Sequence, residues 1–223
     1  MPLGCLPLLL FLWFIFLLPI FFADLMLTAL GKLGLSPSAS IFIAFWIFFG
    51  GLINIPVKHI ARPVNLEYDP LAMFGLGRFI PRKTILRQTI IAVNVGGCVV
   101  PCLVALYEMV RLTVWGPWAV LATVLTTGLN VYICYKVARP LPQVGIVMPP
   151  IVPALAAALS AVVLLPEMAA PVAFIAGVLG PLIGADLLHL DDIVKMDTPM
   201  GSIGGAGTFD GIVISGLVAT LLA

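Results

Sequence analysis

Stretches of about twenty residues with at most one charged side chain recur along almost the whole chain. The hydrocarbon core of a bilayer is about 30 Å thick, so a helix needs about 20 apolar residues to cross it. Seven stretches reach this length, at roughly 3–23, 38–57, 88–107, 112–135, 145–165, 170–188 and 203–222. The sequence therefore predicts an all-α fold, a polytopic bundle of about seven transmembrane helices.

The composition agrees with a bilayer environment. Hydrophobic residues make up 62% of the 223 residues and charged residues only 9%, whereas a soluble domain carries roughly 25% charged residues. The net charge of +1 argues against a nucleic-acid partner. Cys98 and Cys102 are one helical turn apart but have no further ligand nearby, so we expect no metal ion and no cofactor. We expect a single integral membrane domain over residues 1–223, with the lipid bilayer as its surroundings.

Lysine and arginine residues indicate how the chain is oriented. Nine of the eleven lie in three connections, at 58–87, at 136–139 and at 195, and the other two are Lys32 and Arg111. The positive-inside rule assigns the three basic connections to the cytosol, and we expect both termini outside. The connection at 58–87 is the longest polar piece, and we expect an interfacial loop or a short amphipathic helix there.

Short echoes raise the question of an internal repeat. Residues 42–54 share features with 174–184, and N-V-G-G at 94–97 resembles S-I-G-G at 202–205. These pairs would make two parallel halves of three helices joined by the fourth helix, an arrangement found in small transporters. Apolar sequence of low complexity also produces such echoes, so the 3+1+3 repeat stays open.

Two carboxyl groups fall inside predicted spans, at Asp186 and Asp210. An ionised carboxylate near the bilayer centre costs on the order of 2.5–3.5 kcal/mol, so such a group usually faces a cavity and marks function. Both aspartates lie towards the cytosolic ends of consecutive antiparallel helices. We therefore expect them to face each other across one cavity, where Gly205, Gly207 and Gly211 let backbones approach closely.

The two runs around these aspartates resemble a known sequence family. The runs are I-G-A-D-L-L-H-L at 183–190 and S-I-G-G-A-G-T-F-D-G at 202–211, and the resemblance extends to 33–37, 53–56 and 94–97. They resemble an uncharacterised prokaryotic membrane family, domain of unknown function 1614. The resemblance implies a small multi-pass protein of the prokaryotic inner (plasma) membrane and supplies no activity.

A second, partial resemblance concerns mechanism. Presenilin-like and prepilin-peptidase-like intramembrane aspartyl proteases carry one aspartate on one helix and Gly-x-Gly-Asp on the next, and presenilins also carry Pro-Ala-Leu. Here Asp186 precedes Gly205-x-Gly207, two further residues precede Asp210, and Pro153 begins a Pro-Ala-Leu. This resemblance implies that Asp186 and Asp210 form a catalytic pair.

The residues themselves leave three roles open for this pair. Two close carboxyl groups can share a proton, so that one acts as base on a water and the other as acid on a carbonyl. The same groups would also suit the ion site of a transporter for a cation, a proton or a small solute. The third role is structural, with Asp210 as a helix cap or the pair as a tie between helices, in a subunit of a larger complex.

Several further residues are expected to support the pair. His189, one turn beyond Asp186, is expected to be an interfacial residue or a proton-relay partner. Asn54 and Asn94 are expected to form interhelical hydrogen bonds, and under the repeat they would line the same cavity. The ligand would be a transmembrane peptide, an ion or a small solute, and the partner another membrane protein or a second copy. The supporting set is Gly205, Gly207, Gly211, His189, Asn54, Asn94 and Pro153.

The charge asymmetry predicts the outcome of a labelling experiment. We expect an impermeant thiol reagent added to intact cells to label Lys32→Cys but not Arg78→Cys, because the basic 58–87 connection faces the cytosol. The native cysteines are first replaced by alanine, and permeabilised cells, in which both sites react, provide the control. Labelling of the Arg78 variant alone would reverse the orientation.

Overall fold

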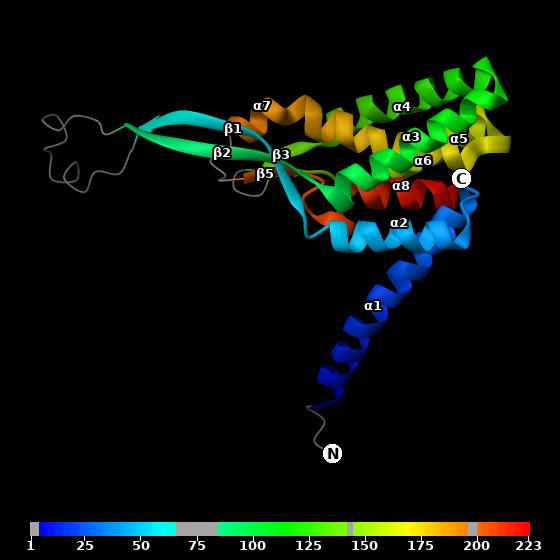
Figure 1. Cartoon of the computed structure of the whole chain (residues 1–223), viewed down its shortest axis with the longest axis horizontal. Helices are drawn as coiled ribbons and strands as arrows, with labels where there is room; N and C mark the ends of the chain where they lie inside the picture. The colour runs from blue at the N-terminus through cyan, green and yellow to red at the C-terminus, as the bar shows by residue number, and fades with distance from the viewer. Residues whose placement is uncertain (1–4, 66–83, 142–144, 196–199) are drawn as a thin grey trace, which may run out of the picture.

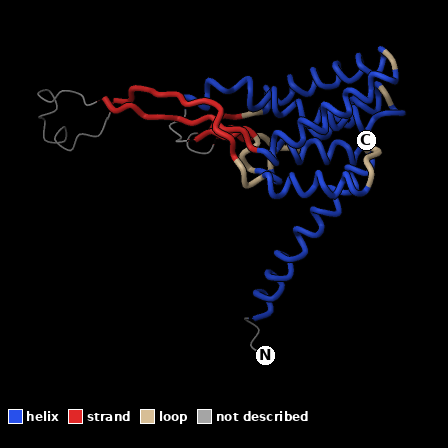
Figure 2. The backbone as a smooth tube through the Cα atoms, in the orientation of Figure 1, coloured by secondary structure: helices blue, strands red, loops and turns tan. Residues whose placement is uncertain are grey.

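The computed structural model describes residues 5–65, 84–141, 145–195 and 200–223. These residues form a bundle of helices with a β-sheet at one end (Figure 1, Figure 2). The middle of the predicted cytosolic connection, with Arg78, lies outside the described residues.

Seven continuous helical runs occur in the described part of the chain, which confirms the predicted helical bundle. The first two are α1 (Cys5–Lys32) and α2 (Pro37–Gly50). The third joins a π-helical turn (Val95–Val99) to α3 (Val100–Leu112), and the fourth is α4 (Pro117–Val137). The remaining three are α5 (Ile151–Leu164), a long run that contains α6 (Ala169–Gly180) and α7 (Leu190–Lys195), and α8 (Gly211–Leu222). Within the described ranges, four segments are long and apolar enough to cross a bilayer: Leu10–Lys32, Val95–Trp115, Pro117–Val137 and Pro166–Asp192.

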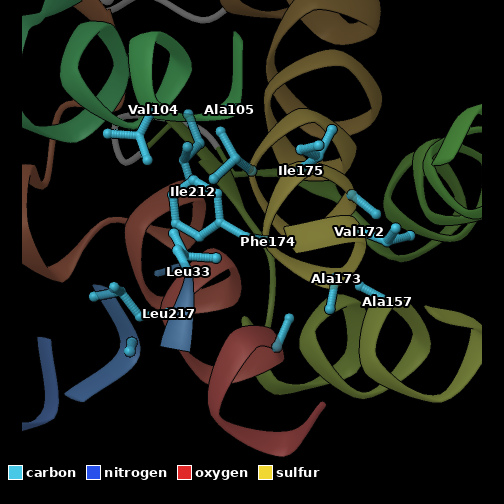
Figure 3. Close-up of a cluster of buried hydrophobic side chains, with 14 of the residues drawn as sticks. Leu33, Val104, Ala105, Ala157, Val172, Ala173, Phe174, Ile175, Ile212 and Leu217 are labelled. Atoms are coloured by element: carbon cyan, nitrogen blue, oxygen red, sulfur yellow. The ribbon is translucent and has the colours of Figure 1, made fainter. Parts of the chain in front are cut away.

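Helix α6 lies at the centre of the bundle, in contact with α3, α4, α5 and α8. Its Phe174 and Ile175 are buried among side chains from neighbouring helices (Figure 3). Gly177 and Gly180 have no room for a Cβ, which would meet the backbone of α8 and the side chain of Asn130 in α4, respectively. Small residues at helix contacts are the usual way to pack helices tightly in lipid, where apolar side chains gain little by leaving the solvent.

Helix α1 differs from the others because only its C-terminal part is packed. Met26 and Leu30 are fully buried, whereas Phe11 and Trp13 are exposed. Figure 1 shows α1 leaving the bundle at a steep angle. The exposed part of α1 is apolar on all sides, as expected of a helix surrounded by lipid.

The structure contains a β-sheet, which was not predicted from the sequence. Strands β1 (Asn54–Asn65) and β2 (Thr84–Asn94) pair antiparallel, from Asn54 opposite Asn94 to Asn65 opposite Thr84. Strand β5 (Met200–Ile203) runs parallel to β2, with Val93 opposite Ile203. Strands β3 (Arg139–Leu141) and β4 (Gly145–Val147) form a separate short hairpin.

These strands correct the predicted bounds of several elements. The helix expected at 38–57 ends at Gly50, the helix expected at 88–107 begins at Val95, and both described ends of the 58–87 connection are strands. Pro56 cannot donate a helical hydrogen bond, and the flanking residues are rich in β-branched side chains that favour strands. Apolar character alone does not separate a buried strand from a buried helix, which is why the sequence predicted helix here.

Three of the seven helical runs are shorter than a membrane crossing. Helices α2 and α5 have 14 residues each and α8 has 12, which corresponds to only about 18–21 Å at ~1.5 Å per residue. The expected helix at 203–222 therefore begins eight residues later, and β5 and a 3₁₀ turn (Gly207–Phe209) precede it. Non-helical backbone at membrane depth is tolerated only where protein or water covers it. The segment before α8 is only partly covered by protein: Gly204, Gly207 and Thr208 are buried, whereas Gly205, Ala206 and Phe209 are exposed.

Six glycines bring three backbone segments together at the sheet end of the bundle. This glycine junction consists of Gly50, Gly51, Gly96, Gly97, Gly204 and Gly207. A Cβ on Gly96 would overlap the end of α2, and a Cβ on Gly97 would overlap the carbonyl oxygen of Gly204. Gly204 and Gly207 also have positive φ angles, 70° and 60°, which side chains other than glycine rarely adopt. The junction anchors the segment before α8 against α2 and α3.

We expect Gly97→Ala to destabilise the protein, because its methyl group would overlap the backbone of Gly204. The cost should be on the order of 1–3 kcal/mol or more, measured as a lower melting temperature of the purified protein in detergent. Gly128→Ala in α4 is the matched control. Nothing lies within 4 Å of a Cβ there, so the exchange should be neutral or stabilise by up to ~1 kcal/mol. Equal effects of the two substitutions would contradict the role of the junction.

Candidate functional site

Asp210 is the N-cap residue of α8. Its backbone is extended, with φ −69° and ψ 149°. One carboxyl oxygen accepts a hydrogen bond from the backbone N–H of Ile212 at 3.0 Å, and the other accepts one from Ala206 at 3.2 Å. The bond from Ile212 satisfies an N–H group that would otherwise lack a partner at the start of α8, and the two bonds together hold the carboxyl group in a defined direction.

Asp186 ends the π-helical stretch Pro181–Asp186 that continues α6. Pro181 has no N–H to donate, which disturbs the regular helical hydrogen bonds, and wide turns of this kind often occur at functional sites. Gly204, in the segment before α8, lines the same pocket as Asp186 and Asp210. This segment therefore borders both aspartates.

Asp186 and Asp210 line one pocket of about 410 Å³, which we call the aspartate pocket. This juxtaposition is the one that the sequence predicts. The other walls come from β4, from β5 and from the glycine-rich segment that follows β5. The lining residues are Gly145, Ile146, Asp186, Met200, Gly201, Ser202, Gly204, Gly205, Ala206 and Asp210.

A chain of hydrogen bonds connects the predicted asparagines to this pocket. Asn94 is fully buried, and its Nδ2 donates to Asn54 Oδ1 at 3.1 Å and to the Gly51 carbonyl oxygen at 2.8 Å. Ser202 Oγ donates to the same Asn54 oxygen at 2.6 Å. The asparagines are thus linked to each other, but between strands β1 and β2 and not between helices as predicted. They reach the pocket only through Ser202.

The predicted glycines occupy three different places. Gly205 lines the aspartate pocket. Gly207 belongs to the glycine junction, where its Cα faces that of Gly51. Gly211 begins α8, and the nearest atom to a Cβ there is Cε of Met148, at 3.7 Å. Of these three predicted glycines, only Gly205 therefore borders the pocket in which a ligand could bind.

His189 and Pro153 do not line the aspartate pocket. The buried His189 ring donates from Nδ1 towards the carbonyl oxygens of Ala185 and Gly184, at 3.0 and 3.2 Å. It also lies against the ring of Tyr135, with 5.0 Å between centroids. Pro153 is buried in the first turn of α5. The structure gives His189 a packing contact between α4 and the end of the α6 run.

No three His, Cys, Asp or Glu side chains among the described residues are arranged to hold a metal ion. Cys98 is buried and Cys102 is partly buried, and both are free thiols. The chemistry that the aspartate pocket offers is therefore that of two carboxyl groups, one hydroxyl group and backbone amides.

Sequence reasoning missed Ser202, Gly145 and Ile146. Ser202 stands at the start of the glycine-rich run, but its role depends on the pairing of β5 with β2, which no local pattern indicates. Gly145 and Ile146 reach the pocket from strand β4, which lies at the start of the predicted fifth helix. No sequence signal would have found these two.

Comparison with known proteins identifies the family of this chain. The family described as "Protein of unknown function (DUF1614)" matches residues 48–222. The chain belongs to this family. No curated protein and no solved structure matches the chain. The DUF1614 match includes both aspartates and all the strands, whereas the run at 33–37 that contributed to the resemblance lies before it.

The cap geometry of this DUF1614 protein leads to a stability prediction. Asp210→Ala should lower the melting temperature by the equivalent of about 1 kcal/mol, whereas Asp210→Asn should be nearly silent because asparagine caps about as well as aspartate. Ser36→Ala, which removes the side-chain cap of α2, gives a reference for the loss of one cap. If Asp210→Asn destabilises as much as Asp210→Ala, the charge and not the cap holds this segment.

Proposed function

We propose that this protein is an intramembrane aspartyl hydrolase of the prokaryotic plasma membrane, with Asp186 and Asp210 as its catalytic pair. The observation that carries the proposal is that both carboxyl groups line one pocket at the start of α8, a helix too short to cross the bilayer. Two carboxyl groups at membrane depth are costly, which argues for a function that needs both of them.

The proposed reaction is hydrolysis of a peptide bond with one proton shared by the pair. Asp210 accepts two backbone N–H bonds, and such bonds favour the ionised form. Asp210 therefore acts as base and takes a proton from water, whose oxygen attacks the carbonyl carbon, while Asp186 gives its proton to the carbonyl oxygen. The C–N bond then breaks, the nitrogen leaves with a proton from Asp210, and Asp186 recovers its proton from the new carboxyl group.

An extended polypeptide is the substrate that the pocket walls favour. Among the described residues β5 pairs only with β2, and β4 pairs only with β3, so each of the two strands that line the pocket has one edge without a strand partner. A strand edge offers backbone N–H and C=O groups to which an extended chain can add. An ion or a small solute would have no use for such an edge, so this feature favours a hydrolase over a transporter.

A purely structural role of Asp210 is the second candidate, because its carboxyl group caps α8 by accepting from the N–H of Ile212 and also accepts from the N–H of Ala206 in the preceding segment. The ion site of a transporter uses the same two carboxyl groups. Both alternatives predict a protein that does not cleave any reporter.

The proposed membrane orientation starts from the basic connections and differs from the charge-based expectation at one terminus. The contacts of Lys32 with Leu221 place the end of α1 beside the end of α8, at the opposite end of the bundle from the sheet (Figure 1). With the basic sheet end in the cytosol, we propose that the C-terminus is outside. Helix α1 is long and apolar enough to cross the bilayer, so with Lys32 outside, the start of α1 is proposed to be cytosolic, whereas the charge pattern alone suggested an external N-terminus.

Cleavage of a single-span reporter helix by the purified protein in liposomes tests the proposed function. Asp186→Asn and Asp210→Asn should each reduce cleavage at least about 100-fold, because asparagine can act neither as base nor as acid. Asp24→Asn, on the exposed surface of α1, is the matched control and should cleave like the native protein. Unchanged melting temperatures show that the variants stay folded. Intact cleavage in either pocket variant would rule out the pair as catalytic.

The same proteins separate the alternatives. If the pair binds a cation, a cation that binds only the folded state will raise the melting temperature of the native protein and not that of either variant. If no reporter is cleaved and no cation stabilises the protein, the structural role is the one left.

A further inference from the structure

A chain of hydrogen bonds determines which way the Ser202 hydroxyl points. The chain starts at Asn94, which lies between β2 and α3 and has a fully buried side chain. Asn94 Oδ1 accepts from the backbone N–H of Gly97 at 2.7 Å, and its Nδ2 donates to the Gly51 carbonyl oxygen at 2.8 Å. A backbone N–H can only donate and a carbonyl oxygen can only accept. These two contacts therefore assign the oxygen and the nitrogen of the Asn94 amide.

Asn94 in turn orients Asn54, and Asn54 orients Ser202. Because Asn94 Nδ2 is a donor, the Asn54 atom 3.1 Å from it must be the oxygen. Ser202 Oγ lies 2.6 Å from that same oxygen. The only hydroxyl proton of Ser202 therefore points to Asn54, and the hydroxyl group has only lone pairs left for any other partner.

The polar side chains of the aspartate pocket consequently offer one proton, the one that the aspartate pair shares, and otherwise only hydrogen-bond acceptors. Asp186 and Asp210 contribute carboxyl oxygens, and Ser202 contributes the lone pairs of its hydroxyl. The other lining residues are glycine, alanine, isoleucine and methionine, so no lysine, arginine or histidine side chain lines the described pocket. A pair that shares one proton still carries a negative charge. An anion, or a side chain that can only accept, would face unpaired oxygens in this pocket.

We propose that the aspartate pocket selects a cationic hydrogen-bond donor, the ammonium or guanidinium group of a lysine or arginine next to the scissile bond, and that Ser202 determines this specificity. As a substrate preference, this inference rests on the proposed hydrolase. A lysine or arginine near the end of a membrane-spanning segment can extend its long side chain towards the polar boundary, so such a residue can reach a pocket at the cytosolic side of the bundle.

Binding of three capped tripeptides to the purified full-length protein tests the inference without any turnover. The peptides are acetyl-Ala-Xaa-Ala-amide with Lys, Met or Glu at the centre, since methionine is close to lysine in size but uncharged. Isothermal titration should show the Lys peptide binding at least about tenfold more tightly than the Met peptide, the size of one charge-assisted hydrogen bond. The Glu peptide should not bind measurably.

Two variants assign the preference to Ser202. Ser202→Ala should weaken binding of the Lys peptide about five- to tenfold and leave the Met peptide unchanged, because one acceptor is lost. Asn54→Ala keeps the Ser202 hydroxyl but removes the oxygen that accepts its proton. The hydroxyl can then point its proton into the pocket, so the difference in affinity between the Lys and Met peptides should become smaller. Ser38→Ala on α2, remote from the pocket, is the control, and melting curves verify that each variant is folded.

Equal affinity for the Lys and Met peptides in the native protein, tighter binding of the Glu peptide, or no binding of any of the three would overturn the inference. Lysine-selective binding in a protein that cleaves no reporter would rule out the proposed hydrolase and support the preference of the pocket for a cation. Reporter cleavage together with equal affinity for the Lys and Met peptides would rule out the cationic preference and support the hydrolase.

Discussion

The close approach of three backbone segments at the glycine junction is the contact on which the rest of the site depends. Gly97 and Gly204 lie so near each other that neither has room for a side chain, and Gly96 lies equally close to the end of α2. This contact fixes the segment after β5 against the end of α2 and against the start of the helical run that contains α3. The same segment lines the aspartate pocket beside Asp186 and leads directly into Asp210.

The bilayer makes the polar side chains of this region obligatory. Helix N-termini leave N–H groups without a partner, and in lipid each such group costs several kcal/mol. Asn94 caps the run that starts at Val95, and Asp210 caps α8. Both caps lie at the sheet end of the bundle, where the positive ends of two helix dipoles also favour negative charge. The conditions that make a carboxylate pair tolerable at membrane depth therefore come from the same elements that build the aspartate pocket.

How far the sequence could predict this fold depended on the kind of element. The helices at Pro117–Val137 and Pro166–Asp192 were predictable, because an apolar run of about 20 residues with almost no charge has the length and composition of a membrane-spanning helix. The strands β1 and β2 were not, because their apolar residues fit a membrane helix equally well by composition. The pairing of Asn54 with Asn94 brings these strands into register over a long separation along the chain. No local pattern contains that information.

For the candidate site, the sequence by itself determined the environment and the two key residues. Carboxyl groups in apolar runs are rare because they are costly, so Asp186 and Asp210 were identifiable from their positions alone. Only the tertiary structure decided that they share one pocket, that His189 packs against Tyr135 away from it, and that Ser202 completes the wall. It also decided the direction of the Ser202 hydroxyl, through contacts with Asn54 and Asn94. Those facts depend on a parallel strand pairing and on backbone contacts between glycines, which arise only when distant segments pack together.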